Sequence, residues 1–556
     1  MIITAIDNAN KFVLRWRDEN NKRLESEVGY VDFNPYFYIL ASETERSGVN
    51  ITEYVNGRKD SFRIQLHYTV DGSVSLDGRA LKKVTWNPPK PGYTRELRKQ
   101  WSETFEADVP FHYRYAIDCL THLPEYKLRK FYWDLEWQQR GPHDGAITCI
   151  SYYDNYTKKS KVYWWQPDSV NRKVKGHSKP FDTERKMLSA FVDDIIDKDP
   201  DMLIAWFGSK FDLPKLIERL HENGIDPRAI SPCHDVKGVY FSDGIKLSKT
   251  VKNYTPIEQP VRGRLILNLD LAFERQWNDA QRGTLPSLAL DYVSENVLGE
   301  KKLVSEKFPD KNQFFSRGWL EDTQNYLDYA KKDVDLIVRI DEENYTSEAI
   351  LSLQRLIVAP FDACFYASNM GGIYFMRNAT WKAPTGDKEG ERIEYEGAMI
   401  YNPESEGTNG LHLGVAAFDF AGLYPSMMIA RNISWETKST EPTEFGVNVL
   451  IPRDFSPVKF EDWKYYRTDE LGLLPKAVLD LKKLRTEYKK RMYSAKDPAE
   501  YAKWNNNQLA VKRLMASFYG VVGYQGFGWA DVDLAASITA SAREAIREAA
   551  FKVMEL

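Results

Sequence analysis

Four acidic side chains, accompanied by a tyrosine, could together form a site for divalent metal ions. In the segment FYWDLEW, which has the alternation of a β-strand, Asp134 and Glu136 leave the same face. Asp212 lies where an apolar segment gives way to a predicted helix, and Tyr329 and Asp333, four residues apart, share one face of another. Neighbouring carboxylates repel each other unless a cation or proton lies between them, and hard divalent ions prefer oxygen ligands. Each pattern alone also fits an ordinary exposed surface, so the metal-site hypothesis depends on the whole set.

A second group of side chains suits the binding of phosphate groups. Asp419 follows an apolar stretch that we expect to be a strand, and Pro425 opens a helix whose first N–H groups can meet phosphate oxygens. Between residues 471 and 520, eleven Lys or Arg residues stand against four Asp or Glu residues, which concentrates positive charge there. Two predicted helices carry the side chains that would face a ligand: Lys482, Arg485 and Lys489 on the first, Lys512 and Tyr519 on the second.

The composition describes a soluble protein of several domains. A chain of 556 residues is too long for one ordinary core, and three or four domains are expected. The sequence has no uninterrupted apolar run of about 18 residues, so we expect no membrane segment, and the amino terminus lacks the layout of a signal peptide. The four cysteines form no CxxC pair, which indicates neither a zinc site nor a disulfide framework and favours a reducing cytoplasm.

The periodicities predict a multidomain protein of the α/β and α+β classes. The predicted order is a β-rich domain (1–125), an α/β domain (126–340), a helical connector (341–394), the first part of a second α/β domain (395–474), a basic helical segment (475–522) and a last helix (523–556).

The acidic set, taken in order, resembles the three motifs of the DnaQ-like (DEDDy) exonucleases that are fused to B-family DNA polymerases. The motifs are DxE at Asp134 and Glu136, FDxP from Phe211 to Pro214, and YxxxD at Tyr329 and Asp333. The resemblance implies an RNase H-like 3′–5′ exonuclease domain in which Asp134, Glu136 and Asp333 bind metal, Asp212 completes the site and Tyr329 orients the attacking water. Two Mg²⁺ ions are implied, and Mn²⁺ fits equally well. The family usually has Asn where this chain has Phe207, and we expect a change in how the frayed strand is held rather than loss of chemistry.

The phosphate-binding set resembles the polymerase motifs of the same family. The segment VAAFDFAGLYPSMMIARNIS is similar to motif A, with Gly422 where Ser is usual, and KRLMASFYG is similar to motif B, with Ala516 in place of Asn. This implies a palm that begins at residue 395 and helical fingers over 475–522. The resemblance implies that Asp419 binds metal and that Leu423, Arg485, Lys489 and Lys512 contact the triphosphate. Tyr424 would be the steric gate that excludes a ribose 2′-OH, and Tyr519 would contact the nascent base pair. Tyr395 and Gly397 would contact template DNA.

The family continues into a DTD motif, motif C, which supplies a second palm carboxylate, and then into a thumb. No DTD triplet occurs in the sequence. We therefore expect an incomplete palm, no thumb, and either a truncated product or, as the favoured interpretation, the large subunit of a split archaeal or viral polymerase. A second polypeptide would then supply motif C and the thumb, and the last helix would expose an apolar face that has no sheet partner: Ile538, Ala542, Ala545, Ala549 and Val553.

Three hypotheses of function stay open. The leading one is DNA synthesis with proofreading on primer–template DNA and dNTPs; the others are a stand-alone 3′–5′ exonuclease with a DNA-holding polymerase remnant, and an inactivated scaffold. Binding of a sliding clamp is left open, as is uracil sensing, for which Pro35, Tyr36 and Arg114 align loosely with the pocket of archaeal enzymes.

Overall fold

A computed structural model describes residues 1–6, 9–55, 58–168, 170, 172, 174–279, 285–386, 392–399, 413–416, 419–452 and 459–555. Contacts divide the chain into two compact units. The first unit is Met1–Gly29 with Thr121–Asp362, and the second is Tyr30–Leu120 with Ala363–Leu556. The first 29 residues are thus grouped with the predicted α/β domain rather than with the rest of the predicted β-rich domain. Over these ranges no helix is both long enough and apolar enough to cross a bilayer.

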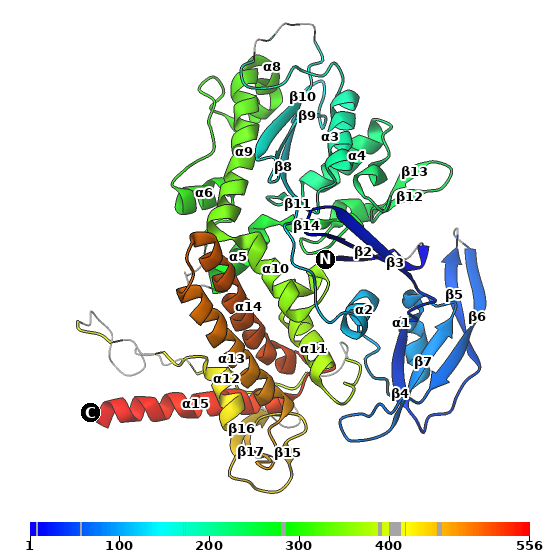
Figure 1. Ribbon diagram of the computed structural model, residues 1–556, viewed down its shortest axis with the longest axis vertical. Coiled ribbons are helices and arrows are strands. Elements are labelled where there is room, and N and C mark those ends of the chain that lie inside the picture. Colours follow the sequence, from blue (N-terminus) through cyan, green and yellow to red (C-terminus); the bar gives the residue numbers. More distant parts are fainter. Residues whose placement is uncertain are drawn as a thin grey trace. The chain divides into compact units, whose positions relative to one another are not determined.

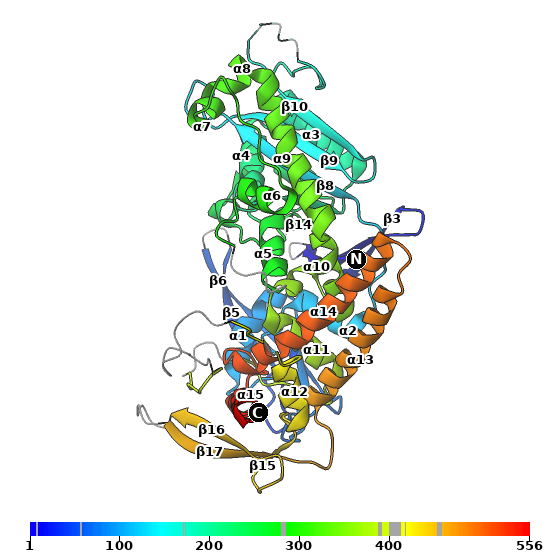
Figure 2. The same ribbon diagram turned by 90° about the vertical axis from the view of Figure 1, so that its left-hand side faces the viewer.

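A five-stranded mixed sheet forms the centre of the first unit (Figure 1). In spatial order its strands are β10 (Lys159–Trp164), β9 (Ile147–Asp154), β8 (Lys130–Trp137), β11 (Met202–Ala205) and β14 (Leu265–Asn268). Strand β8 pairs antiparallel with β9 and parallel with β11, so it lies at the middle of the sheet. Helix α9 (Thr323–Asn344) covers one face of β8, β9 and β10, and α3 (Glu184–Lys198) packs on β9 and β10 (Figure 2).

The alternation in β8 places apolar and acidic side chains on opposite faces, as the sequence predicts. Trp133 and Leu135 are buried in the core, and the Trp133 ring lies 6.1 Å from the ring of Phe191 in α3. Asp134 and Glu136 leave the other face, which α9 covers. The sheet and α9 together therefore fix the position of both carboxylates.

A small antiparallel sheet at the amino terminus is fastened to this unit by buried charges. Its strands are β1 (Ile2–Ile6), β2 (Lys11–Arg17) and β3 (Arg23–Gly29). Asp199, at the end of α3, accepts from Arg15 at 3.1 Å, Arg23 at 2.9 Å and Arg264 at 2.8 Å. Burial raises the pKa of Asp199, but the guanidinium groups of Arg264, Arg15 and Arg23 outweigh it and lower that pKa to about 2.

We expect Asp199→Asn to lower the free energy of unfolding of the first unit by about 2 kcal/mol at neutral pH, since one pKa unit corresponds to ~1.4 kcal/mol. Asparagine accepts the left-handed backbone of this residue (φ +43°). The folded-state pKa is depressed, so the stabilisation is present above the unfolded pKa near 3.8 and is lost as the pH falls toward 2. Denaturant titrations at neutral and acidic pH should therefore show the difference from wild type shrinking in acid, while the exposed neighbour Asp197→Asn serves as control.

The second unit combines a β-sheet with a group of long helices (Figure 1). Its four-stranded sheet has the order β4 (Tyr36–Leu40), β7 (Leu81–Asn87), β6 (Arg58–Thr69) and β5 (Gly48–Val55). The helices are α2 (Phe111–Cys119), α11 (Ala367–Asn378), α12 (Leu423–Ala430), α13 (Leu473–Tyr493), α14 (Pro498–Gly523) and α15 (Val532–Glu555). A smaller sheet contains β15 (Lys438–Ser439), β17 (Lys459–Tyr466) and β16 (Val447–Pro452).

Helices α13 and α14 pack against each other, and α13 buries a stripe of apolar side chains at helical spacing. Val478, Leu481 and Met492 of α13 are buried, and Leu484 is half-buried. Pro498 is the first residue of α14, where its fixed φ suits a helix start, and Asp497 caps that helix by accepting from the N–H of Glu500. Residues 475–493 and 498–522 of the segment predicted to be helical thus lie in α13 and α14.

Two local expectations differ from the structure. The sequence predicts an exposed apolar face on α15, but Ile538 and Ala542 are buried, and the helix packs on β16, α12 and α14. Near the end of α15 the same face becomes exposed to solvent, and Val553 is 58% exposed. The expected strand before Asp419 is not found in residues 413–416 and 419–420, which are neither helix nor strand, and residues 417–418 lie outside the described part of the chain.

Candidate functional site

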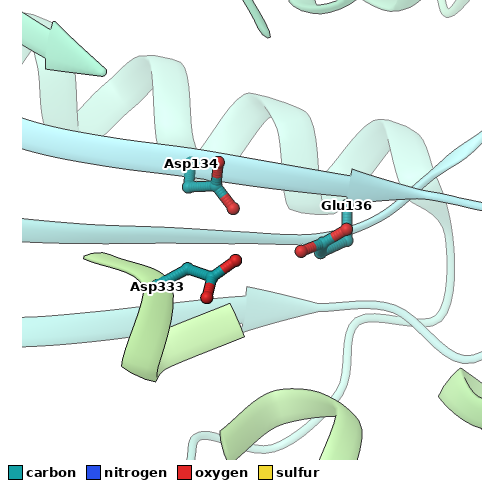
Figure 3. A group of neighbouring side chains, drawn as sticks. All are labelled: Asp134, Glu136 and Asp333. Atoms are coloured by element: carbon teal, nitrogen blue, oxygen red, sulfur yellow. The ribbon is translucent and has the colours of Figure 1, made fainter. Parts of the chain in front are cut away.

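Three carboxylates from two elements of the first unit meet at the α9 face of the sheet. Asp134 and Glu136 come from β8, and Asp333 comes from α9 (Figure 3). One carboxylate oxygen from each lies within 4.8 Å of the others. Burial, and then the charge of Asp134, raises the pKa of Glu136 well above its usual range. Such a cluster of buried acids is stable only with protons or cations among its oxygens.

The fourth predicted acid lies close to the same strand. Asp212 is the first residue of α4 (Asp212–Glu222) and is buried. Burial and the charge of Asp134 raise the pKa of Asp212, while a hydrogen bond from the main-chain N–H of Leu135 lowers it. All four predicted exonuclease acids are therefore brought together.

Tyr329 stands beside Asp333 on α9, as their spacing predicts. It is 6% exposed, and a hydrogen bond links it to Asp333. The rings of Phe314 and Phe315 lie edge-on to the Tyr329 ring, with centroids 5.5 and 5.9 Å away. These two rings belong to a short π-helical turn, Phe314–Gly318, which fixes the direction of the hydroxyl.

Lys302, which is not among the residues predicted from the sequence, brings a positively charged side chain to the site. The ammonium group of Lys302 donates to Asp333 Oδ2 at 2.6 Å and to the Tyr329 hydroxyl at 3.2 Å. Lys302 lies in a segment without regular structure between α6 (Leu290–Leu298) and α9. The run of two lysines at Lys301 and Lys302 was the only signal for it, and a charge run of that kind is usually exposed.

The donor set fits divalent metal ions of the hard, oxygen-preferring kind. Asp333 Oδ1 is buried and has no hydrogen-bond partner among the described residues. A buried, unpaired carboxylate oxygen is costly unless something binds it. Together with the free oxygens of Asp134 and Glu136 it forms an all-carboxylate site, which matches Mg²⁺ or Mn²⁺ rather than zinc.

The second unit holds a cavity of about 810 Å³ between α12, α13 and α14. It gathers most of the residues that the sequence predicts for nucleotide binding. The lining includes Asp419, Gly422, Tyr424, Lys482, Arg485, Lys489, Lys512, Ala516 and Tyr519. Arg485 Nε donates to Gln508 Oε1 at 3.1 Å, and Lys482 Nζ donates to Ser426 Oγ at 3.1 Å. Four basic side chains and one acid on a single cavity suit a triphosphate that carries a metal ion.

The backbone of the turn after Asp419 explains why this chain has Gly422 where the resembled motif usually has Ser. Gly422 has φ +68°, a conformation that favours glycine, and it directly precedes α12. Leu423 is the first residue of α12 but is absent from the cavity lining, whereas Tyr424 faces Tyr519 with ring centroids 4.8 Å apart. Asp419 is exposed.

The segment around Tyr395 and Gly397 is attached to the cavity wall and to α15. The Tyr395 and Tyr519 hydroxyl oxygens are 3.0 Å apart, within hydrogen-bond distance. Arg543 Nη1 donates to the carbonyl oxygens of Glu396 at 2.7 Å and Gly397 at 2.6 Å. The sequence analysis did not single out Arg543.

The residues aligned with a uracil-sensing pocket have intramolecular partners. Arg114 is buried and pairs with Glu106 at 2.8 Å, and its guanidinium lies 5.0 Å from the ring of Tyr36. The Tyr36 hydroxyl donates to Asp118 at 2.6 Å. Uracil sensing stays a prediction.

Comparisons with known proteins give matches on both units. The family described as DNA polymerase family B matches residues 366–555, and the one described as DNA polymerase family B, exonuclease domain, matches residues 132–271. A DNA polymerase of Pyrococcus glycovorans is 28% identical over 98% of this chain and 67% of its own length. The DNA polymerase of Thermococcus sp. (strain 9oN-7) is 27% identical over 92% of this chain and 63% of its own length.

A solved structure shares the fold. The family B DNA polymerase from the hyperthermophilic archaeon Pyrobaculum calidifontis superposes with a TM-score of 0.70 at 18% sequence identity, over all of this chain and 71% of that one.

These observations define a polymerase fold that includes an exonuclease domain. The chain belongs to DNA polymerase family B, and it spans 63–67% of the length of the two relatives above.

Proposed function

We propose that this chain removes nucleotides from the 3′ end of DNA by metal-dependent hydrolysis. The observation that carries the proposal is the group formed by Asp134, Glu136 and Asp333, whose oxygens lie within 4.8 Å of one another, with Asp212 beside them. These acids would hold two Mg²⁺ or Mn²⁺ ions, which when bound activate a water and stabilise the departing 3′-oxygen.

The other residues of the site position the reactants. The Tyr329 hydroxyl, held by its aromatic neighbours and by Lys302, would accept or donate a hydrogen bond to the attacking water. Lys302 places one positive charge against four buried acids, which lowers the repulsion that a phosphodiester anion meets on entering the site.

DNA synthesis is the second proposed activity, and the cavity of the second unit supports it. Lys482, Arg485, Lys489 and Lys512 would bind the triphosphate of a dNTP, Tyr424 would exclude a ribose 2′-OH, and Tyr519 would contact the nascent base pair. In this assignment the palm contains Asp419 and the fingers are α13 and α14, with Tyr395 and Gly397 against the template. Primer–template DNA is the shared substrate of both sites.

Synthesis by a two-metal mechanism needs a second carboxylate beside Asp419. The sequence of residues 1–556 contains no DTD triplet, so a further segment with motif C, in this protein or in another, would have to supply that carboxylate.

A primer-extension assay on 5′-labelled primer–template DNA with Mg²⁺, with and without dNTPs, tests both activities. We expect the primer to be shortened in both conditions. If the purified chain also extends the primer in a variant without exonuclease activity, the need for a further segment with motif C is refuted. If the chain neither shortens nor extends it, the scaffold hypothesis replaces the proposal.

A further inference from the structure

The loop between β11 and α4 holds an aromatic residue in a conformation that aromatic residues rarely adopt. Phe207 has φ +58°, in the left-handed region that favours Gly and Asn and disfavours bulky side chains. Its N–H donates to Asp270 Oδ1 at 3.1 Å, and its carbonyl oxygen accepts from the N–H groups of Lys210 and Phe211. The fold therefore fixes this backbone against the preference of the side chain.

The neighbouring residues leave the loop no freedom to relax. A Cβ on Gly208 would lie 2.6 Å from the Ala205 side chain, so the chain passes too close there for any larger residue. The next residue, Ser209, donates its N–H to Asn268 Oδ1 at 2.8 Å and accepts from Asn268 Nδ2 at 2.8 Å. Strain of this kind persists where the surroundings over-determine it, and it is concentrated at functional sites.

The strained ring is only partly packed: one of its neighbours is the buried Trp206, whose ring centroid lies 6.4 Å away. Phe207 is only half-buried, and its ring lies edge-on to that of Phe211 at 6.3 Å, with an angle of 86° between the planes. Phe211 is 46% exposed and directly precedes Asp212 of the acidic group. The ammonium group of Lys210 lies 5.2 Å from the Phe211 ring centroid. Lys210 and Phe211 thus directly precede the acid Asp212 in the chain, and the half-buried Phe207 ring lies against the exposed Phe211 ring.

This combination matches the chemistry of an unpaired nucleotide. Every base has a π-face that stacks on aromatic rings whatever its sequence, and a nearby cation suits the phosphate. We propose that Phe207, together with Phe211, stacks on the base of an unpaired 3′-terminal nucleotide, and that the loop keeps its strained backbone for this contact. The inference rests on the proposed exonuclease function and makes Phe207 a residue that selects frayed ends.

Two substitutions separate the ring from the backbone strain. Phe207→Asn removes the ring and relieves the backbone strain, while Phe207→Leu removes the ring but leaves the backbone strain in place. We expect Phe207→Asn to raise the Tm of the first unit by roughly 2 °C, and Phe207→Leu to give no such gain. Phe551→Asn, which removes an exposed ring of α15, is the control.

The deciding measurement is the affinity for single-stranded oligonucleotides in Ca²⁺, by fluorescence anisotropy, with a normal or an abasic 3′ end. Wild type should bind the normal end about tenfold more tightly than the abasic end, and both Phe207 variants should lose that preference. For hydrolysis in Mg²⁺, the KM of both Phe207 variants should rise while their kcat stays close to that of wild type. If the variants keep the preference, or if Phe207→Asn lowers the Tm, the inference is wrong. If wild type binds with the preference but hydrolyses nothing, the proposed function fails and the inference about binding stands.

Discussion

Replacing Asp134 and Glu136 together by alanine is expected to lower the rate of 3′-end removal by at least about 10³-fold, equivalent to ~4 kcal/mol of lost transition-state stabilisation. The two carboxylates leave one face of β8 toward Asp333, and no other described group of three or more His, Cys, Asp or Glu residues is arranged to hold a metal ion. Single-turnover degradation of a 5′-labelled strand measures the effect.

The control for this variant is Asp193→Ala/Asp197→Ala, which removes two exposed acids from α3. It changes the net charge by the same amount and should leave degradation unchanged. A double variant at Asp134 and Glu136 that still degraded DNA within tenfold of wild type would show that the nuclease site lies elsewhere. Circular dichroism of both variants excludes unfolding as the cause.

Saturating Mg²⁺ is expected to stabilise the first unit, and more strongly at about pH 8 than at about pH 5. Burial, and then the charge of Asp333, raises the pKa of Asp134 to about 7, and the pKa values of Glu136, Asp212 and Asp333 are raised as well. A folded-state pKa above the unfolded value means that the folded protein keeps protons that the unfolded chain releases. Metal-free stability therefore falls as the pH rises from about 4 to about 7.

Metal ions replace these protons, so their effect is largest where the protons are absent. An ion at about 100 times its Kd contributes ~2.7 kcal/mol, which corresponds to a Tm increase of roughly 5 to 10 °C for a unit of this size. Differential scanning fluorimetry with Mg²⁺ or with EDTA at the two pH values measures it. Equal shifts at both pH values, or an undiminished shift in Asp134→Ala/Glu136→Ala, would contradict the assignment of the ions to this site.

The residues of the site that could be predicted from the sequence are those whose spacing in a single strand or helix places them on one face. The two-residue repeat of β8 and the four-residue spacing of Tyr329 and Asp333 determine which side chains share a face. Lys302 could not be found in this way, because no helix or strand contains it and only tertiary contacts bring its ammonium group to Asp333.

The remaining differences have the same physical origin. Ile538 and Ala542 of α15 are apolar at helical spacing, but their burial depends on elements that pack on α15 from elsewhere in the chain, such as β16, some ninety residues earlier. The grouping of the first 29 residues with residues 121–362 depends on arginines such as Arg15 reaching Asp199, a contact between residues 184 positions apart. Local patterns carry no information about such pairings.

The contact between the Tyr395 and Tyr519 hydroxyls makes the nucleotide cavity and the 395–397 segment parts of one equilibrium. Tyr519 lines the cavity, and Arg543 holds the carbonyl oxygens that follow Tyr395. A ligand that binds one conformation of Tyr519 more tightly than another also changes which conformations of residues 395–397 are populated. By thermodynamic reciprocity, if a ligand of the cavity changes the affinity of residues 395–397 for a second ligand, that second ligand changes the affinity of the cavity by the same factor. In the proposed assignment, in which the cavity binds a nucleotide and residues 395–397 contact DNA, the two binding free energies are thus linked through the hydroxyls of Tyr395 and Tyr519.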